Sequence, residues 1–250
     1  MGHRDMGLSL TILGCSGSYA EPGGACSGYL VRDGGTSLWL DCGPGTLGNL
    51  QRHVSLADLS AIVVSHHHPD HFGELPVAYN AVKWYLERET IPVIAPVSVR
   101  EMADAMVGHD TSDVFDWRIV GSGDELSIDG LDLRFDLTEH SVECMAVEIG
   151  SGEEHIVYTA DTSPGWDLEA FAAGADLLLG EASILEVQER PGMPHLSSRQ
   201  LAERARAAGV SRLVITHVIP GNDPEAHLRE AAAIYDGRID IAEVGLTFEV

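Results

Sequence analysis

The stretch "SHHHPDH", Ser65 to His71, holds four histidines and an aspartate and directly follows the apolar run "AIVV". Its spacing reads H-x-H-x-D-H, with His66, His68, Asp70 and His71 as the polar positions. A turn at the end of a strand can direct these side chains onto a metal from several sides. Imidazole and carboxylate are ligands that suit zinc and related divalent ions. A lone histidine is more often an ordinary core or surface residue, so the metal prediction depends on four potential ligands occurring together.

Three further candidate ligands also follow predicted strands. His140 comes after "LDLRFDL", Asp161 after "HIVYTA" and His217 after "RLVIT". The alternative for each is a loop residue that caps a helix or turn, and for Asp161, which precedes Thr162 and Pro164, that alternative is a strong competitor. Since the first cluster already predicts a metal, the capping alternative would require three separate coincidences. The recurrence at strand ends therefore predicts that all three complete one metal site.

The elements that must position these residues alternate between strands and helices. Apolar alternation and helical spacing predict strands at 8–13, 26–32, 36–41 and 59–65, followed by a helix at 72–89. Later strands are predicted at 115–120, 131–137, 144–150, 155–160, 212–217, 239–244 and 246–250, with helices at 201–209 and 224–235. Two strand-then-helix halves predict two sheets packed face to face with helices outside. A single domain over residues 1–250 is expected, since no linker separates the halves.

Composition argues for an ordinary globular chain without a membrane span. Hydrophobic residues make up 44% and charged residues 22%, and no apolar run is long enough to cross a bilayer. The segment "LSLTILGC" after Arg4 invites comparison with a lipoprotein signal, but its apolar part is too short, and a strand with a glycine-rich turn is favoured. The four cysteines, Cys15, Cys26, Cys42 and Cys144, form no C-x-x-C pair, which fits a reducing compartment and predicts a cytoplasmic protein.

The net charge restricts the binding partners. Fifteen basic residues stand against 39 acidic ones, the net charge is −24, and Lys83 is the only lysine. An acidic surface repels phosphate backbones and anionic membranes, so nucleic-acid binding is disfavoured. The acidity itself is most simply interpreted as an aid to solubility. A homodimer is kept open as the oligomeric state.

With these motifs in hand, the sequence resembles the metallo-β-lactamase fold superfamily of dinuclear metallohydrolases from "TILGCSGS" to "ITHV". The resemblance implies an α/β fold, a four-layer αββα sandwich of two mixed sheets with outer helices. It also implies two divalent ions, zinc first, with manganese and iron as alternatives. His67 is the variable position of the motif. The implied ligands are His66, His68 and His140 for one ion, Asp70, His71 and His217 for the other, and Asp161 as the bridge.

Two more segments point to the ribonuclease Z branch of that superfamily. "GEAS", with Glu181, resembles its His-Glu-Ala-Thr segment, although Gly180 replaces the histidine, and "PHLSSRQ", with His195, resembles its histidine-serine-threonine helix start. The resemblance implies that His195 donates a proton to the leaving group and that Glu181 is its partner. The structural alternatives are that Glu181 caps "ASILEVQE" and that His195 and Ser197 begin a helix.

Two departures from ribonuclease Z favour a smaller substrate. That family carries a long arm that grips transfer RNA and an arginine soon after its last histidine ligand, whereas here only 43 residues separate Pro96 from His140 and "VIPGND" follows His217. The chain is more similar to small phosphodiesterases of the branch, including cyclic-nucleotide phosphodiesterases. We therefore expect a small-molecule phosphodiester substrate such as a 3′,5′-cyclic nucleotide. Two ions would activate water and neutralise the phosphate, with Asp70 also orienting the attacking water.

Four other functions are weighed against this one. A ribonuclease Z-type endonuclease processing the 3′ end of transfer RNA remains open. A lactonase or thioesterase on the same metals would be favoured if His195 lay far from them. A dinucleotide-binding oxidoreductase, suggested by "GCSGS" with Asp33 downstream, lacks the G-x-G-x-x-G spacing. A catalytically dead binding module would be expected to have lost ligands, and none is lost.

Overall fold

The computed structural model describes residues 7–250, so Arg4 lies outside the described residues. The first sheet has seven strands: β1 (Ser9–Gly14), β2 (Gly28–Asp33), β3 (Thr36–Leu40), β4 (Ala61–Val63), β5 (Ile91–Ala95), β6 (Phe115–Ile119) and β14 (Thr247–Glu249). Its spatial order is β14-β1-β2-β3-β4-β5-β6. Neighbours are antiparallel from β14 to β3 and parallel from β3 to β6, so the sheet is mixed.

The second sheet repeats this plan. Its seven strands are β7 (Glu125–Ile128), β8 (Leu131–Leu137), β9 (Met145–Ser151), β10 (Glu154–Tyr158), β11 (Leu177–Glu181), β12 (Arg212–Thr216) and β13 (Arg238–Ile241). They are ordered β13-β12-β11-β10-β9-β8-β7, antiparallel from β7 to β10 and parallel from β10 to β13. This sheet is mixed as well.

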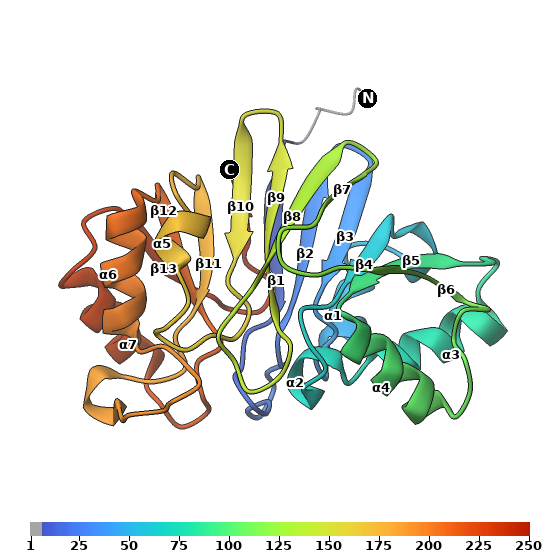
Figure 1. Cartoon of the computed structure of the whole chain (residues 1–250), viewed down its shortest axis with the longest axis horizontal. Helices are drawn as coiled ribbons and strands as arrows, with labels where there is room; N and C mark the ends of the chain where they lie inside the picture. The colour runs from blue at the N-terminus through green and yellow to red at the C-terminus, as the bar shows by residue number, and fades with distance from the viewer. Residues whose placement is uncertain (1–6) are drawn as a thin grey trace.

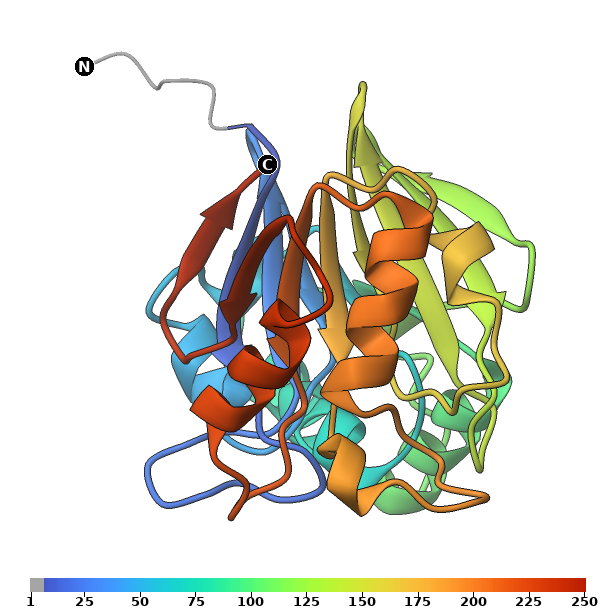
Figure 2. The same cartoon turned by 90° about the vertical axis from the view of Figure 1, so that its left-hand side faces the viewer.

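Helices cover the outer face of each sheet, which completes the predicted four-layer sandwich (Figure 1). The helices are α1 (Thr46–Leu50), α2 (Pro69–Phe72), α3 (Leu75–Tyr85), α4 (Val97–Val107), α5 (Leu168–Phe171), α6 (Ser198–Ala208) and α7 (Pro224–Ala232), with short 3-10 turns at Leu56–Asp58 and Glu186–Gln188. Helices α3 and α4 lie on the first sheet, and α5, α6 and α7 on the second. Figure 2 shows α6 lying along the face of the second sheet.

The strand sequences explain these layers. Side chains alternate between the two faces of a strand. In β2, Tyr29 and Val31 enter the apolar core between the sheets, whereas Leu30 faces the helices. In β3, Trp39 likewise faces the helices. Strands with both faces buried read as continuous apolar runs, which is how "TILG" and "SLWL" appear in the sequence.

The strand directions bring the candidate site residues to one edge of the sandwich. In the first sheet β1, β3 and β4 run the same way, and in the second β8, β10, β11 and β12 do. The loops that follow these strands therefore gather at their carboxyl ends, where α2 lies at the lower edge of Figure 1. Open α/β sheets bind ligands at this end of their strands.

The structure departs from the predicted elements in a few places. The helix predicted at 72–89 is shorter at both ends: α3 begins at Leu75, since Phe72 belongs to the separate short helix α2, and it ends at Tyr85 because Leu86 has an extended backbone. The strands β5, β7 and β11 and the helices α1, α4 and α5 were not predicted, and most of them are too short to give a clear period. The first predicted strand is confirmed as β1. Among residues 7–250, every helix is too short or too polar to span a bilayer.

Candidate metal centre and active site

The seven predicted metal ligands come together in two adjoining groups. One group contains His66, His68, His140 and Asp161, and the other contains Asp70, His71 and His217. Within the first, His68 Nδ1 lies 3.0 Å from His66 Nε2 and 3.1 Å from His140 Nε2. Within the second, His217 Nε2 lies 3.2 Å from both His71 Nε2 and Asp70 Oδ2. Ligands about 2.0–2.2 Å from one tetrahedral ion lie roughly 3.3 Å from each other, so both groups fit a divalent metal.

Asp161 stands between the two groups with one oxygen toward each. Its Oδ1 lies 3.2 Å from His71 Nε2 and 3.4 Å from His217 Nε2. Its Oδ2 lies 3.8 Å from His66 Nε2 and 3.7 Å from His140 Nε2. Oδ1 is buried without a hydrogen-bond partner, which a cation at this position would satisfy. The carboxylate is therefore placed to bridge two ions.

The electrostatics also suit metal binding. Burial is the main cause that holds the pKa of His66 well below its usual value, so this imidazole is neutral, the form that binds metal. Burial alone would raise the pKa of Asp161, but His217 and His71 hold it well below its usual range. His67 belongs to neither group.

Asp41 is a site residue that the sequence analysis missed. Its side chain accepts hydrogen bonds from Ser65 N (2.8 Å), Ser65 Oγ (2.9 Å) and Tyr158 Oη (2.8 Å), and its Oδ2 lies 2.7 Å from His71 Nδ1. A carboxylate on the far nitrogen of a ligating histidine fixes the orientation of the ring. Asp41 is the last residue of the predicted strand 36–41. Like the ligand candidates it is a polar residue at a strand end, and this position could have identified it.

The glycine-rich loop after β1 also supports the centre. Ser18 N donates to Asp70 Oδ2 (2.8 Å), and Gly17 N donates to Val218 O (3.0 Å). A Cβ on Gly17 would lie 2.5 Å from His217 O and 2.8 Å from His217 Nδ1. This close approach requires glycine. The "GCSGS" loop therefore packs directly against the candidate ligand His217.

Unusual backbone conformations gather around the same centre. Within the described residues, five non-glycine residues have positive φ, and four of them belong to the site: Ser18 (62°), Asp41 (58°), Ala160 (50°) and His217 (60°). Such conformations cost on the order of 1–3 kcal/mol each and persist where the surrounding structure enforces them. Their clustering indicates that the fold places these side chains at an energetic cost, as functional sites do.

Replacement of Gly17 by alanine should weaken metal binding. The added Cβ would collide with the backbone and ring of His217, and lost support of a ligating histidine lowers metal affinity by about 10–100-fold. Elemental analysis after dialysis should find fewer bound ions in Gly17→Ala than in wild type. Gly48→Ala in α1, where a Cβ meets nothing within 4 Å, is the matched control. Full metal content in Gly17→Ala would contradict this role of the loop.

His195 and Glu181 lie beside the centre as a bonded pair. His195 Nδ1 is 3.0 Å from Glu181 Oε1 and 4.0 Å from Asp161 Oδ2, and its ring stacks on that of His217. Burial alone would lower the pKa of His195, but the carboxylates of Glu181 and Asp161 raise it to about 9. The bond to Glu181 therefore favours the protonated form of the imidazole.

The structural alternatives for this pair hold only in part. Ser197, not His195, caps α6, because Ser197 Oγ accepts from Gln200 N. Glu181 accepts from Ser183 N in a local turn, yet it also accepts from Leu196 N. Gly180, where the resembled motif has histidine, packs so closely on α6 that a Cβ would lie 2.5 Å from Leu201 Cδ1.

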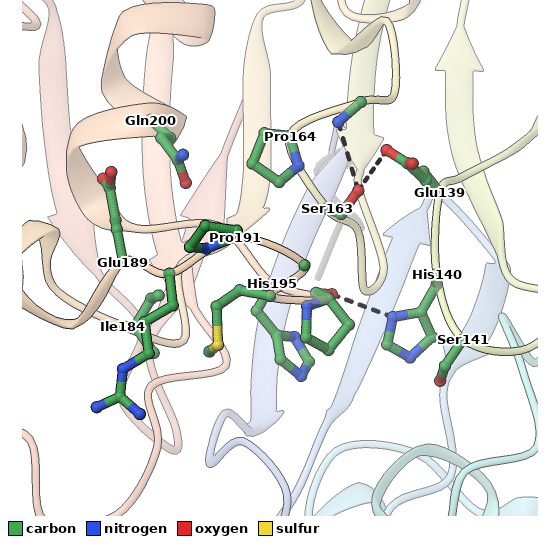
Figure 3. A pocket seen from close by; sticks show the side chains of 15 residues that line it. Glu139, His140, Ser141, Ser163, Pro164, Ile184, Glu189, Pro191, His195 and Gln200 are labelled. Carbon is green, nitrogen blue, oxygen red and sulfur yellow. Dashed lines mark hydrogen bonds between the residues drawn. The ribbon is translucent and has the colours of Figure 1, made fainter.

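A cavity of about 790 Å³ opens beside His140 and His195. Figure 3 shows Glu139, His140 and Ser141 on one side of it and Ile184 and Glu189 on the other. Its volume suits a ligand of nucleotide size. Arg190 is the one lysine or arginine among the residues that line it. Glu189 is paired with Arg199 at 3.0 Å, so part of the acidic charge of the wall is neutralised.

Comparison with known proteins identifies the family of this chain. A model of the beta-lactamase superfamily domain matches residues 36–218. The chain belongs to this superfamily. It is 30% identical to the probable metallo-hydrolase YhfI of Bacillus subtilis, across 97% of this chain and 100% of that protein. It is 28% identical to ribonuclease Z of Mycobacterium bovis (strain BCG), across 94% of this chain and 95% of that protein.

Solved structures place the chain in the metallo-β-lactamase fold. The crystal structure of YhfI superposes with a TM-score of 0.89 at 27% identity, covering 97% of this chain and 99% of that one. Unliganded yeast PDE1 superposes with a TM-score of 0.80 at 15% identity, covering 98% and 100%, which shows a shared fold alone. The superfamily members that the chain resembles support a metal-dependent hydrolase.

Proposed function

We propose that this superfamily member is a dinuclear metal-dependent phosphodiesterase that hydrolyses small phosphodiesters, with 3′,5′-cyclic nucleotides as the leading candidates. The observation that carries the proposal is the bonded pair His195 and Glu181 beside the metal centre, in which His195 lines the cavity and Glu181 is buried behind it. Phosphodiester cleavage needs a proton donor at the leaving oxygen, whereas lactone and thioester hydrolysis does not need this pair. The proximity of His195 to Asp161 weighs against a lactonase or thioesterase.

The seven ligand candidates would hold two ions, which supply a water-derived nucleophile and neutralise the charge of the phosphate. Five imidazoles and two carboxylates favour zinc, with manganese and iron as alternatives. Asp161 would hold both ions, and Asp70 would hold one of them and also orient the attacking water. Glu181 binds His195 Nδ1, so His195 presents its other nitrogen, Nε2, to the leaving group as proton donor.

A ribonuclease Z-type activity is the second candidate, because a ribonuclease Z is 28% identical across most of the chain. Two observations favour the smaller substrate. A polyanion needs many contacts from basic side chains, and the chain has 15 basic against 39 acidic residues. Residues 97–137, in the interval where the resembled family would need room for its arm, are largely occupied by α4, β6, β7 and β8.

A substrate panel should separate these activities. Metal-reconstituted protein should hydrolyse 3′,5′-cyclic nucleotides and bis(p-nitrophenyl) phosphate with a far larger kcat/KM than lactones or thioesters. Precursor transfer RNA should be processed little or not at all, even at low ionic strength, where attraction to RNA is strongest. Efficient precursor cleavage with cyclic nucleotides untouched would falsify the assignment. The homodimer and the cytoplasmic location stay predictions of the sequence.

A further inference from the structure

Ser183 joins two parts of the centre that the proposed function treats separately. Its Oγ lies 2.8 Å from His217 Nδ1 and 2.8 Å from Glu181 Oε2. All three side chains are buried. We propose that Ser183 is a positioning residue that links the metal ligand His217, through Glu181, to the proton donor His195. This inference rests on the metal site of the proposed function.

The direction of each hydrogen bond follows from metal binding. His217 turns Nε2 toward Asp70 and Asp161, so Nε2 must offer its lone pair to the ion. A neutral imidazole then carries its proton on Nδ1 and donates it to Ser183 Oγ. The single hydroxyl proton of Ser183 is left free for Glu181 Oε2. Each group therefore donates to the next: His217 Nδ1 to Ser183 Oγ, and Ser183 Oγ to Glu181 Oε2.

Glu181 connects this series of hydrogen bonds to His195. A carboxylate only accepts, so His195 Nδ1 at 3.0 Å from Oε1 must carry a proton and donate it. Thr162 N and Leu196 N also donate to Oε1, at 3.2 and 3.3 Å. These donors come from the loop after β10 and from the segment before α6. Both oxygens of Glu181 are therefore held, and the hydroxyl of Ser183 is the side-chain donor that fixes Oε2.

Ser183 Oγ is the hydrogen-bonding partner of Nδ1 on the His217 ring. The ring of His195 stacks on one face of the His217 ring, 5.4 Å away with 29° between the planes. Contacts on the ring faces do not select which nitrogen carries the proton. The bond from Nδ1 to Ser183 Oγ does, and it would also hold the ring in the orientation that turns Nε2 toward an ion.

The test compares Zn²⁺ affinity among serine variants, by titration against a competing chelator. Ser183→Ala should weaken one of the two Zn²⁺ sites by about 10–100-fold. Ser183→Thr keeps the hydroxyl and should restore most of that affinity. Ser198→Ala is the matched control, because Ser198 Oγ also lies 2.8 Å from a buried imidazole, Nδ1 of His227, which is outside the metal groups. It should bind Zn²⁺ as wild type does.

Equal Zn²⁺ affinity in Ser183→Ala and Ser198→Ala would overturn the inference, as would failure of the threonine variant to regain affinity. A measurement on wild type covers the case in which Ser183→Ala does not fold. Nitrogen NMR of the Zn²⁺-loaded protein should show a protonated Nδ1 on His217, and an unprotonated Nδ1 would overturn the proposal. None of these readouts uses a substrate. A wild-type protein that binds two Zn²⁺ but cleaves no phosphodiester would refute the proposed function and leave the role of Ser183 standing.

Discussion

Asp161→Ala should hold fewer than the two divalent ions per chain that we expect in wild type, and it should lose nearly all turnover. One oxygen of this carboxylate faces His71 and His217, and the other faces His66 and His140. A bound ion contributes several kcal/mol to charge stabilisation in the transition state, so its loss should lower the rate by on the order of 10³-fold or more. Elemental analysis and steady-state kinetics on the same preparations test both effects, and chelation of wild type should abolish turnover.

Two further variants separate bridging from folding. Asp161→Asn keeps the size of the side chain but offers one carbonyl oxygen, so it should also lose the bridge. Asp176→Ala removes a carboxylate that pairs with His155 on the second sheet and should keep both ions. Wild-type metal content and rate in Asp161→Ala would rule out a bridging role. A metal-free preparation that remains active would end the metal-centre hypothesis as a whole.

His195→Ala should retain both ions yet lose roughly 10²–10⁴-fold in kcat on substrates with a poor leaving group. An alkoxide, such as that released from a cyclic nucleotide, needs a proton as it departs. An aryl oxide scarcely does, so hydrolysis of bis(p-nitrophenyl) phosphate should fall much less. The comparison of the two substrates on one variant isolates proton donation from any general damage to the site.

The control for this variant is a second histidine paired with a carboxylate. His155 lies 3.4 Å from Asp176, outside the metal groups, and His155→Ala should leave both rates near wild type. Equal losses on alkyl and aryl substrates in His195→Ala would assign His195 to substrate binding in place of acid catalysis. Loss of metal in that variant would instead identify His195 as a further ligand. Its Nδ1 lies 4.0 Å from Asp161 Oδ2, which is close enough for both to bind one ion.

The metal-ligand candidates could be predicted because local sequence carries most of their signal. Four of them occupy one short turn, and the others follow apolar strands. Strands of one direction end at the same edge of a sheet, so residues in equivalent positions after such strands are expected to converge. The resemblance to the superfamily supplied the two groups, and the structure places the members of each group together.

The supporting residues were harder to predict, since their roles depend on partners far away in the sequence. Asp41 contacts Tyr158, 117 residues away, and Gly17 approaches His217 across 200 residues. Ser183 is an ordinary small residue in the sequence, and its importance comes from standing between His217 and Glu181. Nothing in the local pattern distinguishes such residues from neighbouring turn residues.

The sequence by itself determined the alternation of apolar strands and amphipathic helices and the chemical type of the site, because side-chain period and ligand spacing are local properties. Only the tertiary structure decided which hydroxyl, amide and carboxylate hold each ligand in place. The loops after β1 and β3 bond to the turn after β4, and the loop after β10 bonds to Glu181 at the end of β11. The bond from Tyr158 in the second sheet to Asp41 in the first exists only once the two sheets have packed. Hydrogen-bond geometry varies over tenths of an ångström, whereas a sequence pattern specifies only the order in which the donors and acceptors occur.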